Sequence, residues 1–191
     1  DYHKSERPKI PRPAGPILII GITLSLIVIY FLTFNEKILA ILLTTIIAFL
    51  IGYIDDKKVM PGLFKPVALL IAALPILLLG AYDTNLNLIF GHAFIPLLYI
   101  PLILIAIPVI GNTINSIDVL NGVASGFILI ACIPLMISVY IFGSVEVFLA
   151  SLALFFGTLA FYKFHKFPSK IFPGDSGTLL LGAMYGAIAI T

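Results

Sequence analysis

Long apolar runs, separated by short polar segments, make up most of the chain. A membrane helix needs about 20 mostly apolar residues, and seven runs approach or reach this length: 16–34, 37–54, 66–81, 94–115, 119–142, 147–164 and 176–191. The runs are apolar on all sides, as buried or membrane-spanning helices are. The pattern predicts an all-α fold, a polytopic membrane bundle of seven transmembrane helices, with residues 1–191 forming a single integral membrane domain.

Local features refine this picture. Four prolines lie inside the runs and predict kinks, which membrane helices tolerate: Pro75, Pro101, Pro108 and Pro134. Residues 83–92 contain turn-forming and strand-forming side chains, which predict a turn and a short hairpin between the third and fourth runs. The spacing Gly182-x-x-x-Gly186 places small residues on one helix face and favours close helix packing.

The connections between the runs fall on alternating sides of the membrane. One side holds 1–15, 55–65, 116–118 and 165–175. Only Lys37 lies on the other side. The remaining ten of the eleven basic residues lie on or next to the first side: Lys4, Arg7, Lys9, Arg12, Lys57, Lys58, Lys65, Lys163, Lys166 and Lys170. Cytoplasmic loops carry an excess of Lys and Arg, so we expect these four segments to be cytoplasmic.

The composition excludes several classes of protein. The chain is 61% hydrophobic and only 10% charged, with a mean hydropathy of +1.17, whereas a soluble domain has about 25% charged residues. A net charge of +2 with dispersed basic residues gives no support for nucleic-acid binding. Cysteine and histidine form no cluster along the sequence, so it gives no support for a zinc or haem site. The chain begins inside a polar segment and ends inside an apolar run, so we expect it to be the central part of a longer membrane protein.

Three polar clusters lie on the predicted cytoplasmic side: Asp55-Asp56 with Lys65, the Asn-rich segment 111–122, and Phe172-Pro173-Gly174-Asp175-Ser176-Gly177. Each has a plain structural explanation, as interfacial charge, as a polar joint between helices, or as a helix N-cap. Together they place carboxylates, amides and a lysine at one membrane surface. Hard oxygen ligands of this kind suit Mg²⁺, which binds carboxylates, waters and substrate phosphates.

These clusters resemble the signature loops of the polyprenyl-phosphate N-acetylhexosamine-1-phosphate transferases, a family of the glycosyltransferase 4 type. The resemblance runs in order through nearly all of the chain and is carried by three motifs: Asp55-Asp56…Lys65, Asn112-x-x-Asn115-x-x-Asp118-x-x-Asn121-Gly122 and Phe172-Pro173-Gly174-Asp175-Ser176-Gly177. Residues 1–4 and 11–15 are more loosely similar to the family's first cytoplasmic loop. Family members have about ten membrane helices, and the seven here would be the second to the eighth.

The resemblance is closest to the dolichyl-phosphate branch, through Phe167-Pro168-Ser169-Lys170-Ile171-Phe172 and the nine-residue step from Asp56 to Lys65. It implies transfer of GlcNAc-1-phosphate from UDP-GlcNAc to a polyprenyl (dolichyl) phosphate, the first step of lipid-linked oligosaccharide synthesis for protein N-glycosylation. An archaeal cell membrane or the endoplasmic reticulum would be the location, and a homodimer the assembly. The alternatives are a bacterial-type undecaprenyl-phosphate enzyme, a membrane transporter and a membrane scaffold without catalytic activity.

The resemblance also implies roles for individual residues. Asp175 and Asn115 would bind Mg²⁺, with Mn²⁺ as an alternative, and Lys65 would pair with the phosphates. One member of the pair Asp55 and Asp56 would deprotonate or orient the lipid phosphate. The remaining motif residues would bind substrate: Phe172, Asn121, Gly122, Asn112 and Asp118. Phe172 would stack on uracil, Asn121 with Gly122 would line the uridine site, and Asp118 has no defined role.

Overall fold

The computed structural model describes residues 11, 13–62, 64–82, 85–88, 91–94 and 96–191. Most of the loosely similar first loop therefore lies outside the described residues, including the motif Asp1-Tyr2-His3-Lys4. The described part of the chain forms seven helices: α1 (Gly15–Thr33), α2 (Glu36–Lys57), α3 (Phe64–Leu78), α4 (Pro96–Ile117), α5 (Val123–Phe142), α6 (Val145–His165) and α7 (Gly174–Ile190). The predicted all-α bundle is confirmed, with one helix at each predicted run.

Five of these helices, α1, α2, α4, α5 and α6, are long and apolar enough to cross a membrane. α3 and α7 are shorter, at 15 and 17 residues. The four prolines predicted to kink helices lie inside α3, α4 and α5. The kinks themselves stay a prediction. Two short antiparallel strands, β1 (Asn85–Leu88) and β2 (Gly91–Phe94), form the predicted hairpin, although Asn85 belongs to a strand and not to the expected turn.

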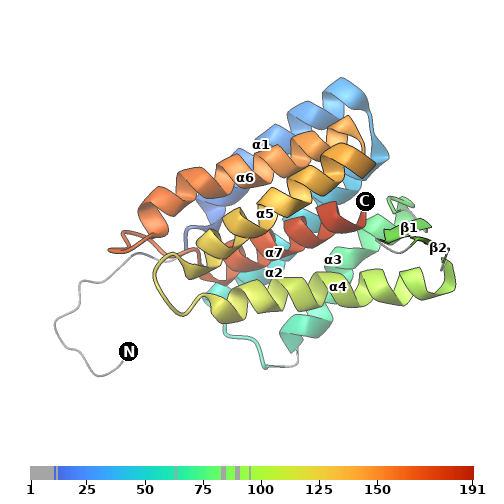
Figure 1. The fold of residues 1–191 in the computed structure, drawn as a ribbon. Coiled ribbons are helices and arrows are strands. Elements are labelled where there is room, and N and C mark those ends of the chain that lie inside the picture. Colours follow the sequence, from blue (N-terminus) through green and yellow to red (C-terminus); the bar gives the residue numbers. More distant parts are fainter. Residues whose placement is uncertain (1–10, 12, 63, 83–84, 89–90, 95) are drawn as a thin grey trace.

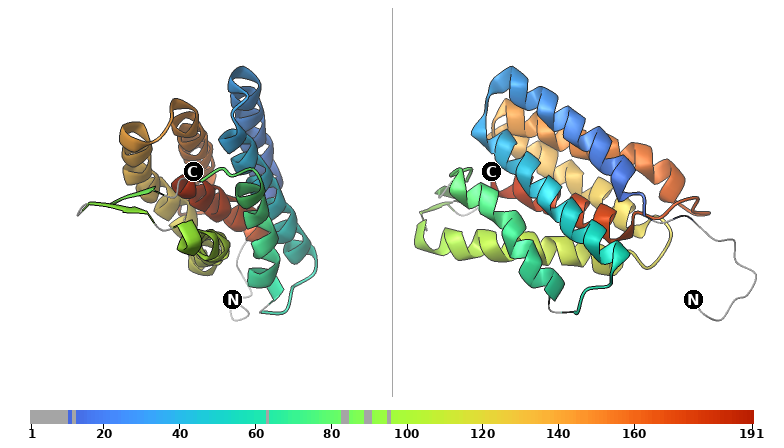
Figure 2. Two further views of the ribbon diagram at one scale, coloured as in Figure 1. Left: turned by 90° about the vertical axis from the view of Figure 1, so that its right-hand side faces the viewer. Right: turned by 180° about the vertical axis from the view of Figure 1, so that it is seen from behind.

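α7 runs through the middle of the bundle and the other helices surround it (Figures 1 and 2). It packs on α1, α2, α4, α5 and α6, and nearly every residue from Ser176 to Ile190 is buried. The outer helices instead expose large apolar side chains, such as Ile17 of α1 at 68% exposure. An exposed apolar surface of this kind suits contact with lipid, so α7 is the helix on which the membrane bundle is built.

All of the predicted cytoplasmic loops that the structure describes lie at one end of the bundle. The connections from α2 to α3, α4 to α5 and α6 to α7 are found here together with the start of α1, whereas the hairpin and the other two connections lie at the opposite end (Figure 1). Because α7 begins at this end, the first turn of the central helix is surrounded by polar loops. The direction in which this end faces in the cell stays a prediction.

The close packing predicted for Gly182 is present at the crossing of α4 and α7. A Cβ atom added to Gly182 would lie 2.8 Å from the Cα of Gly111 and 3.0 Å from the carbonyl oxygen of Ile110. These are backbone atoms of α4, which cannot rotate away as a side chain can. The close approach of the two helices therefore depends on glycine at position 182 of α7.

We expect Gly182→Ala to lower the free energy of unfolding by about 1–3 kcal/mol, because α4 and α7 must move apart. The measurement is the thermal unfolding midpoint in detergent. Gly21→Ala is the matched control, since no atom lies within 4 Å of a Cβ added at that position of α1. Equal midpoints for the two variants would show that the crossing is not tightly packed.

Candidate functional site

Four side chains from four helices meet at the beginning of α7. They are Asp55, Lys65, Asn115 and Asp175, which we call the lysine–carboxylate cluster. The Lys65 ammonium forms an ion pair with Asp55 Oδ2, lies 3.2 Å from Asp175 Oδ2 and 3.4 Å from Asn115 Oδ1. The Asn115 amide also donates to Asp175 Oδ1. The structure thus brings together residues from all three of the motifs identified in the sequence.

Helix ends place these groups. Asp55 lies in the last turn of α2, Lys65 in the first turn of α3, Asn115 in the last turn of α4 and Asp175 in the first turn of α7. Further bonds fix their orientation. The Met60 backbone N–H donates to Asp55 Oδ1 at 2.5 Å, and the Asn115 amide donates to the Thr178 hydroxyl at 2.8 Å. These four helix ends lie on the same side of the bundle, because antiparallel helices return the chain to that side after every second helix.

The charges in this cluster are strongly interdependent. Burial lowers the pKa of Lys65, but its hydrogen bond with Asp55 and the charges of Asp175 and Asp55 outweigh this, so the pKa is raised overall. Lys65 is therefore a stable cation at neutral pH. Burial, together with the neighbouring Asp55, raises the pKa of Asp175 above its ordinary value, although Asn115 and Lys65 oppose the shift. A second cation near Asp175 would favour its ionised form.

The cluster fits a divalent cation by the chemistry of its donors. Within the described residues, no group of three or more His, Cys, Asp or Glu side chains is placed to hold a metal ion. However, two carboxylate oxygens and one amide oxygen converge on a single cationic group, the Lys65 ammonium. Hard oxygen atoms in this number suit Mg²⁺, which completes its coordination with waters and substrate phosphates. Asp175 and Asn115 are the predicted metal ligands, and both are in this set.

Asp56 points away from this cluster. Its two carboxylate oxygens accept hydrogen bonds from the backbone N–H groups at the start of α7, Oδ1 from Asp175 at 2.8 Å and Oδ2 from Ser176 at 2.9 Å. Asp55 and Asp56 therefore make different contacts, although the sequence motif presents them as a pair.

A second group of side chains, which we call the histidine cluster, lies between α4, α5 and α6. His165 is fully buried at the end of α6. Its Nδ1 lies 2.8 Å from the Ser125 hydroxyl, and its Nε2 lies 3.3 Å from Asp118 Oδ1. Its ring stacks on Phe161 and meets the edge of Phe172, with ring centroids 5.3 and 5.4 Å apart. Asp118, to which the motif gave no role, is thus a structural partner of His165.

Sequence reasoning missed His165, Ser125 and Thr178. His165 is a lone histidine at the end of an apolar helix, and Ser125 lies in another apolar run, so neither carries a motif. Thr178 follows Asp175 by three residues. This spacing places the two on one helix face and is the one available signal that the pair would act together.

The remaining motif residues lie around the two clusters. Asn112 is not part of the lysine–carboxylate cluster, because its amide donates to Pro108 O within α4 at 2.8 Å. Gly122 has φ +83° and begins α5, as the predicted Asn121-Gly122 turn requires. Phe172 is buried, at 9% exposure, with its edge against His165. Their predicted roles in binding the nucleotide remain predictions.

We expect Asp118→Ala and His165→Ala each to lower the free energy of unfolding by about 1–3 kcal/mol, because each removes one side of a close contact between buried polar groups. Asp118 Oδ1 and His165 Nε2 lie 3.3 Å apart, and neither atom has a hydrogen bond among the described residues. The double variant should therefore cost less than the sum of the two, by at least about 0.5 kcal/mol. Detergent unfolding of the four proteins measures this coupling. The control cycle pairs Asp118→Ala with Glu146→Ala at the other end of the bundle, and additivity in both cycles would contradict the assignment.

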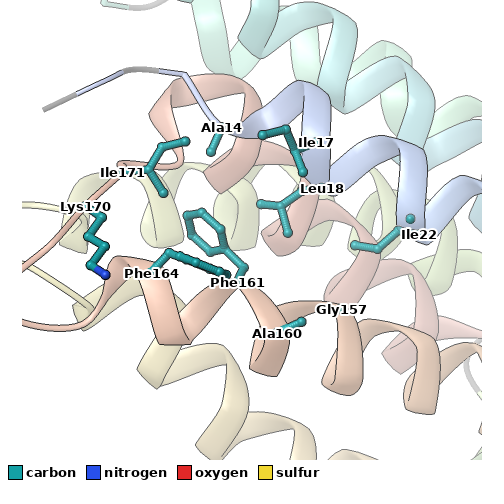
Figure 3. A pocket seen from close by; sticks show the side chains of 11 residues that line it. Ala14, Ile17, Leu18, Ile22, Gly157, Ala160, Phe161, Phe164, Lys170 and Ile171 are labelled. Carbon is teal, nitrogen blue, oxygen red and sulfur yellow. The ribbon is translucent and has the colours of Figure 1, made fainter.

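Two hollows on the surface differ in their relation to the site. The larger, of about 560 Å³, lies between α1 and α6 and is lined almost wholly by apolar side chains, with Lys170 at one end (Figure 3). It contains no member of the lysine–carboxylate cluster. A groove of about 410 Å³ between α3 and α4 is lined by Pro66 and Ser116, the residues that directly follow Lys65 and Asn115, and by Asn112. No member of the cluster lines either hollow, but the smaller groove is lined by chain neighbours of two of them.

Comparison with known proteins identifies the family. Residues 38–191 match glycosyl transferase family 4. The phospho-N-acetylmuramoyl-pentapeptide-transferase of Staphylococcus haemolyticus is 32% identical over 197 residues, which cover 94% of this chain and 61% of the relative. The enzyme of the same name from Staphylococcus saprophyticus is 31% identical with the same coverage.

A protein of Methanocaldococcus jannaschii that is assigned as a glycosyltransferase is 29% identical over 190 residues, covering 100% of this chain and 58% of the relative. The chain thus spans about 60% of the length of these relatives. Bacterial and archaeal relatives match at similar identity, so the comparison does not favour the dolichyl branch over the bacterial type. The resemblance read from the three motifs is confirmed at the level of the family: the chain is an integral membrane protein that belongs to glycosyl transferase family 4.

Proposed function

We propose that the full-length protein transfers an N-acetylhexosamine-1-phosphate, GlcNAc-1-phosphate in the first instance, from its UDP-sugar to a polyprenyl phosphate in a Mg²⁺-dependent reaction. The observation that carries this proposal is the convergence of Asp55, Lys65, Asn115 and Asp175 at one end of a membrane bundle. Such a site lies where a water-soluble nucleotide sugar and the phosphate of a membrane lipid can meet. A transporter would instead be expected to carry its ionisable groups near the middle of the membrane.

The chemistry that this site must support is the approach of two anions. An oxygen of the lipid phosphate attacks the β-phosphorus of the UDP-sugar, the bond from that phosphorus to the bridging oxygen breaks, and UMP leaves with the electron pair. Catalysis of phosphoryl transfer depends mainly on positioning and on neutralising charge. Lys65 supplies a cation whose raised pKa keeps it protonated at neutral pH, and it would hold the phosphates.

Asp175 and Asn115 are the residues that would hold Mg²⁺, in agreement with the oxygen atoms they present beside Lys65. When bound, the ion would supply a further positive charge against the pyrophosphate. Asp55 keeps Lys65 in place through their ion pair and is the carboxylate of the pair that would face the lipid phosphate. Its role there is orientation, because a phosphate monoester is already mostly ionised near neutral pH.

The lipid would reach the site from the side of α3 and α4. The groove between these helices is lined by Pro66 and Ser116, which follow Lys65 and Asn115 in the chain, and by Val109 and Pro108. Its polar wall, formed by Asn112, Thr113 and Ser116, lies near the phosphate-binding end. We therefore assign Asn112 to this path and not to the nucleotide. Phe172, Asn121 and Gly122 stay as the proposed uridine-binding residues, supported by the contact of Gly122 with Lys166 at the start of the loop that contains Phe172.

The finer assignments rest on the sequence motifs. We propose dolichyl phosphate as the acceptor, with undecaprenyl phosphate as the bacterial alternative, and a homodimer in an archaeal cell membrane or the endoplasmic reticulum. The site would face the cytoplasm, because ten of the eleven basic residues accompany it on that side.

The test uses the full-length protein in membranes or nanodiscs, with radiolabelled UDP-sugar and Mg²⁺. Each of UDP-GlcNAc and UDP-N-acetylmuramoyl-pentapeptide is offered with dolichyl or undecaprenyl phosphate, and the product is extracted into organic solvent. We expect lipid-linked label from UDP-GlcNAc with dolichyl phosphate as the better acceptor. Label only from UDP-N-acetylmuramoyl-pentapeptide would show that the assignment of GlcNAc as the sugar is wrong. No transfer from any pair of substrates would overturn the proposal.

A further inference from the structure

The carboxylate of Asp56 caps the N-terminus of α7, where its first partner, Asp175, lies 119 residues further along the chain. The first turn of a helix has backbone N–H groups without partners inside the helix, and a side chain at the N-cap usually accepts from one of them. The N-cap residue of α7 is Pro173, which makes no such bond. Asp56 of α2 accepts from Asp175 N and Ser176 N in its place, at 2.8 and 2.9 Å.

We propose that Asp56 is a positioning residue, which acts on the reaction by fixing the first turn of α7 and thereby the side chain of Asp175. The inference rests on the proposed function only in giving Asp175 a role at the metal. It narrows the prediction that either Asp55 or Asp56 acts on the lipid phosphate, because it assigns Asp56 to the start of α7. Successive residues of a helix project about 100° apart, so the two side chains serve different neighbours.

The backbone of α2 is shaped for this contact. Gly52 lies one helical turn before Asp56 on the same face of α2. A Cβ atom at Gly52 would lie 2.4 Å from the Asp175 carbonyl oxygen and 2.6 Å from the Ser176 Cα. α2 and α7 therefore touch backbone to backbone, and this close approach brings the Asp56 carboxylate within reach of the α7 N–H groups.

Gly174 completes the arrangement on the other side. It has φ +69°, a conformation that favours glycine. A Cβ atom there would lie 2.7 Å from Asp56 Oδ1 and 2.6 Å from Pro13 Cβ. The carboxylate thus fills the space that a side chain at position 174 would need, and only glycine lets it reach the helix end.

The contact also changes how the start of α7 is understood. A helix N-terminus attracts anions through its partial positive charge and its free N–H groups, and Gly174-Asp175-Ser176 forms such an N-terminus. In the structure a protein carboxylate already accepts from the N–H groups of Asp175 and Ser176. Substrate phosphate would therefore be held by Lys65 and the metal, and not by these two amides.

Amide hydrogen exchange tests the proposal without using activity. The N–H groups of Asp175 and Ser176 have no acceptor within α7, so their protection reports on Asp56. In the full-length protein we expect Asp56→Ala to speed their exchange roughly tenfold or more. Asp56→Asn, which keeps one accepting oxygen, should give a smaller increase. Glu146→Gln, which changes an acid at the opposite end of the bundle, should leave this exchange at the wild-type rate.

Metal binding and kinetics give the second readout. Loss of a group that orients a metal ligand weakens metal binding by about 10–100-fold, and we expect a loss of this size for Mn²⁺ bound to Asp56→Ala, measured by electron paramagnetic resonance. The KM for polyprenyl phosphate should stay within about twofold of wild type when Mn²⁺ is saturating, because the proposal gives Asp56 no contact with the lipid.

Unchanged exchange at residues 175 and 176, or a raised KM for the lipid with unchanged Mn²⁺ binding, would overturn the proposal and return Asp56 to the lipid phosphate. If Asp56→Ala does not fold, the same comparison is made with Asp56→Asn. Failure of the proposed function would appear differently, as a wild-type protein that transfers no sugar phosphate while its exchange still depends on Asp56.

Discussion

Asp175→Asn in the full-length protein is expected to reduce sugar-phosphate transfer by at least about a hundredfold. The substitution keeps the size of the side chain, but it removes the negative charge and leaves one accepting oxygen where Asp175 presents one to Asn115 and one to Lys65. Mg²⁺ prefers ionised carboxylate ligands, so binding of Mn²⁺, measured by electron paramagnetic resonance, should weaken together with the activity. The thermal unfolding midpoint should change little, because an amide oxygen can still accept from Lys65.

Glu146→Gln is the matched control for this variant. It also changes an acid to its amide, in the first turn of α6 and at the other end of the bundle. Activity and Mn²⁺ binding should both equal those of wild type. If Asp175→Asn kept its Mn²⁺ binding while losing activity, Asp175 would act on the substrate and the assignment as a metal ligand would be wrong.

Lys65→Met should also lower transfer by at least about a hundredfold, because the phosphates lose a fixed cation in a partly buried site. Its effect on the metal should be the opposite of that of Asp175→Asn. The Lys65 ammonium lies among the same oxygen atoms of Asp175 and Asn115 that would bind the metal. Removing this competing cation should leave Mn²⁺ binding equal or tighter. Transfer assays and Mn²⁺ titration of one preparation separate these two effects.

Stability needs its own control here, because Lys65→Met leaves the buried Asp55 without its ion-pair partner. Breaking a buried pair costs about 3–5 kcal/mol. The double variant Lys65→Met with Asp55→Asn removes both charges and should recover most of the lost stability but none of the activity. Lys58→Met, at an exposed lysine after α2, should be silent in both assays. Loss of Mn²⁺ binding in the stable double variant, but not in Asp55→Asn alone, would show that Lys65 supports the metal and does not compete with it.

The sequence was sufficient for the helices and for the end of the bundle at which the chemistry lies. Apolar runs bounded by polar residues determine where membrane helices begin and end, and strict alternation then places Asp55, Lys65, Asn115 and Asp175 on one side. The three motifs pointed to the same residues. Their convergence on one ammonium group follows from how the four helix ends meet.

The division between Asp55 and Asp56 could not be predicted in the same way. It depends on which helix packs against each face of α2, and that choice is made by close contacts such as Gly52 against Asp175. His165 was missed for a related reason. A lone histidine has meaning only through its neighbours, and its partners Ser125 and Asp118 are 40 and 47 residues away in the sequence, in other parts of the bundle.

The fate of the β-phosphorus tests the central claim most directly. UDP-GlcNAc labelled with ³²P in the β-phosphate is incubated with the full-length protein, polyprenyl phosphate and Mg²⁺. Transfer of a sugar phosphate moves the label into the lipid and releases unlabelled UMP, and this is the result we predict. Label that remains in released UDP, with the sugar alone on the lipid, would contradict the account.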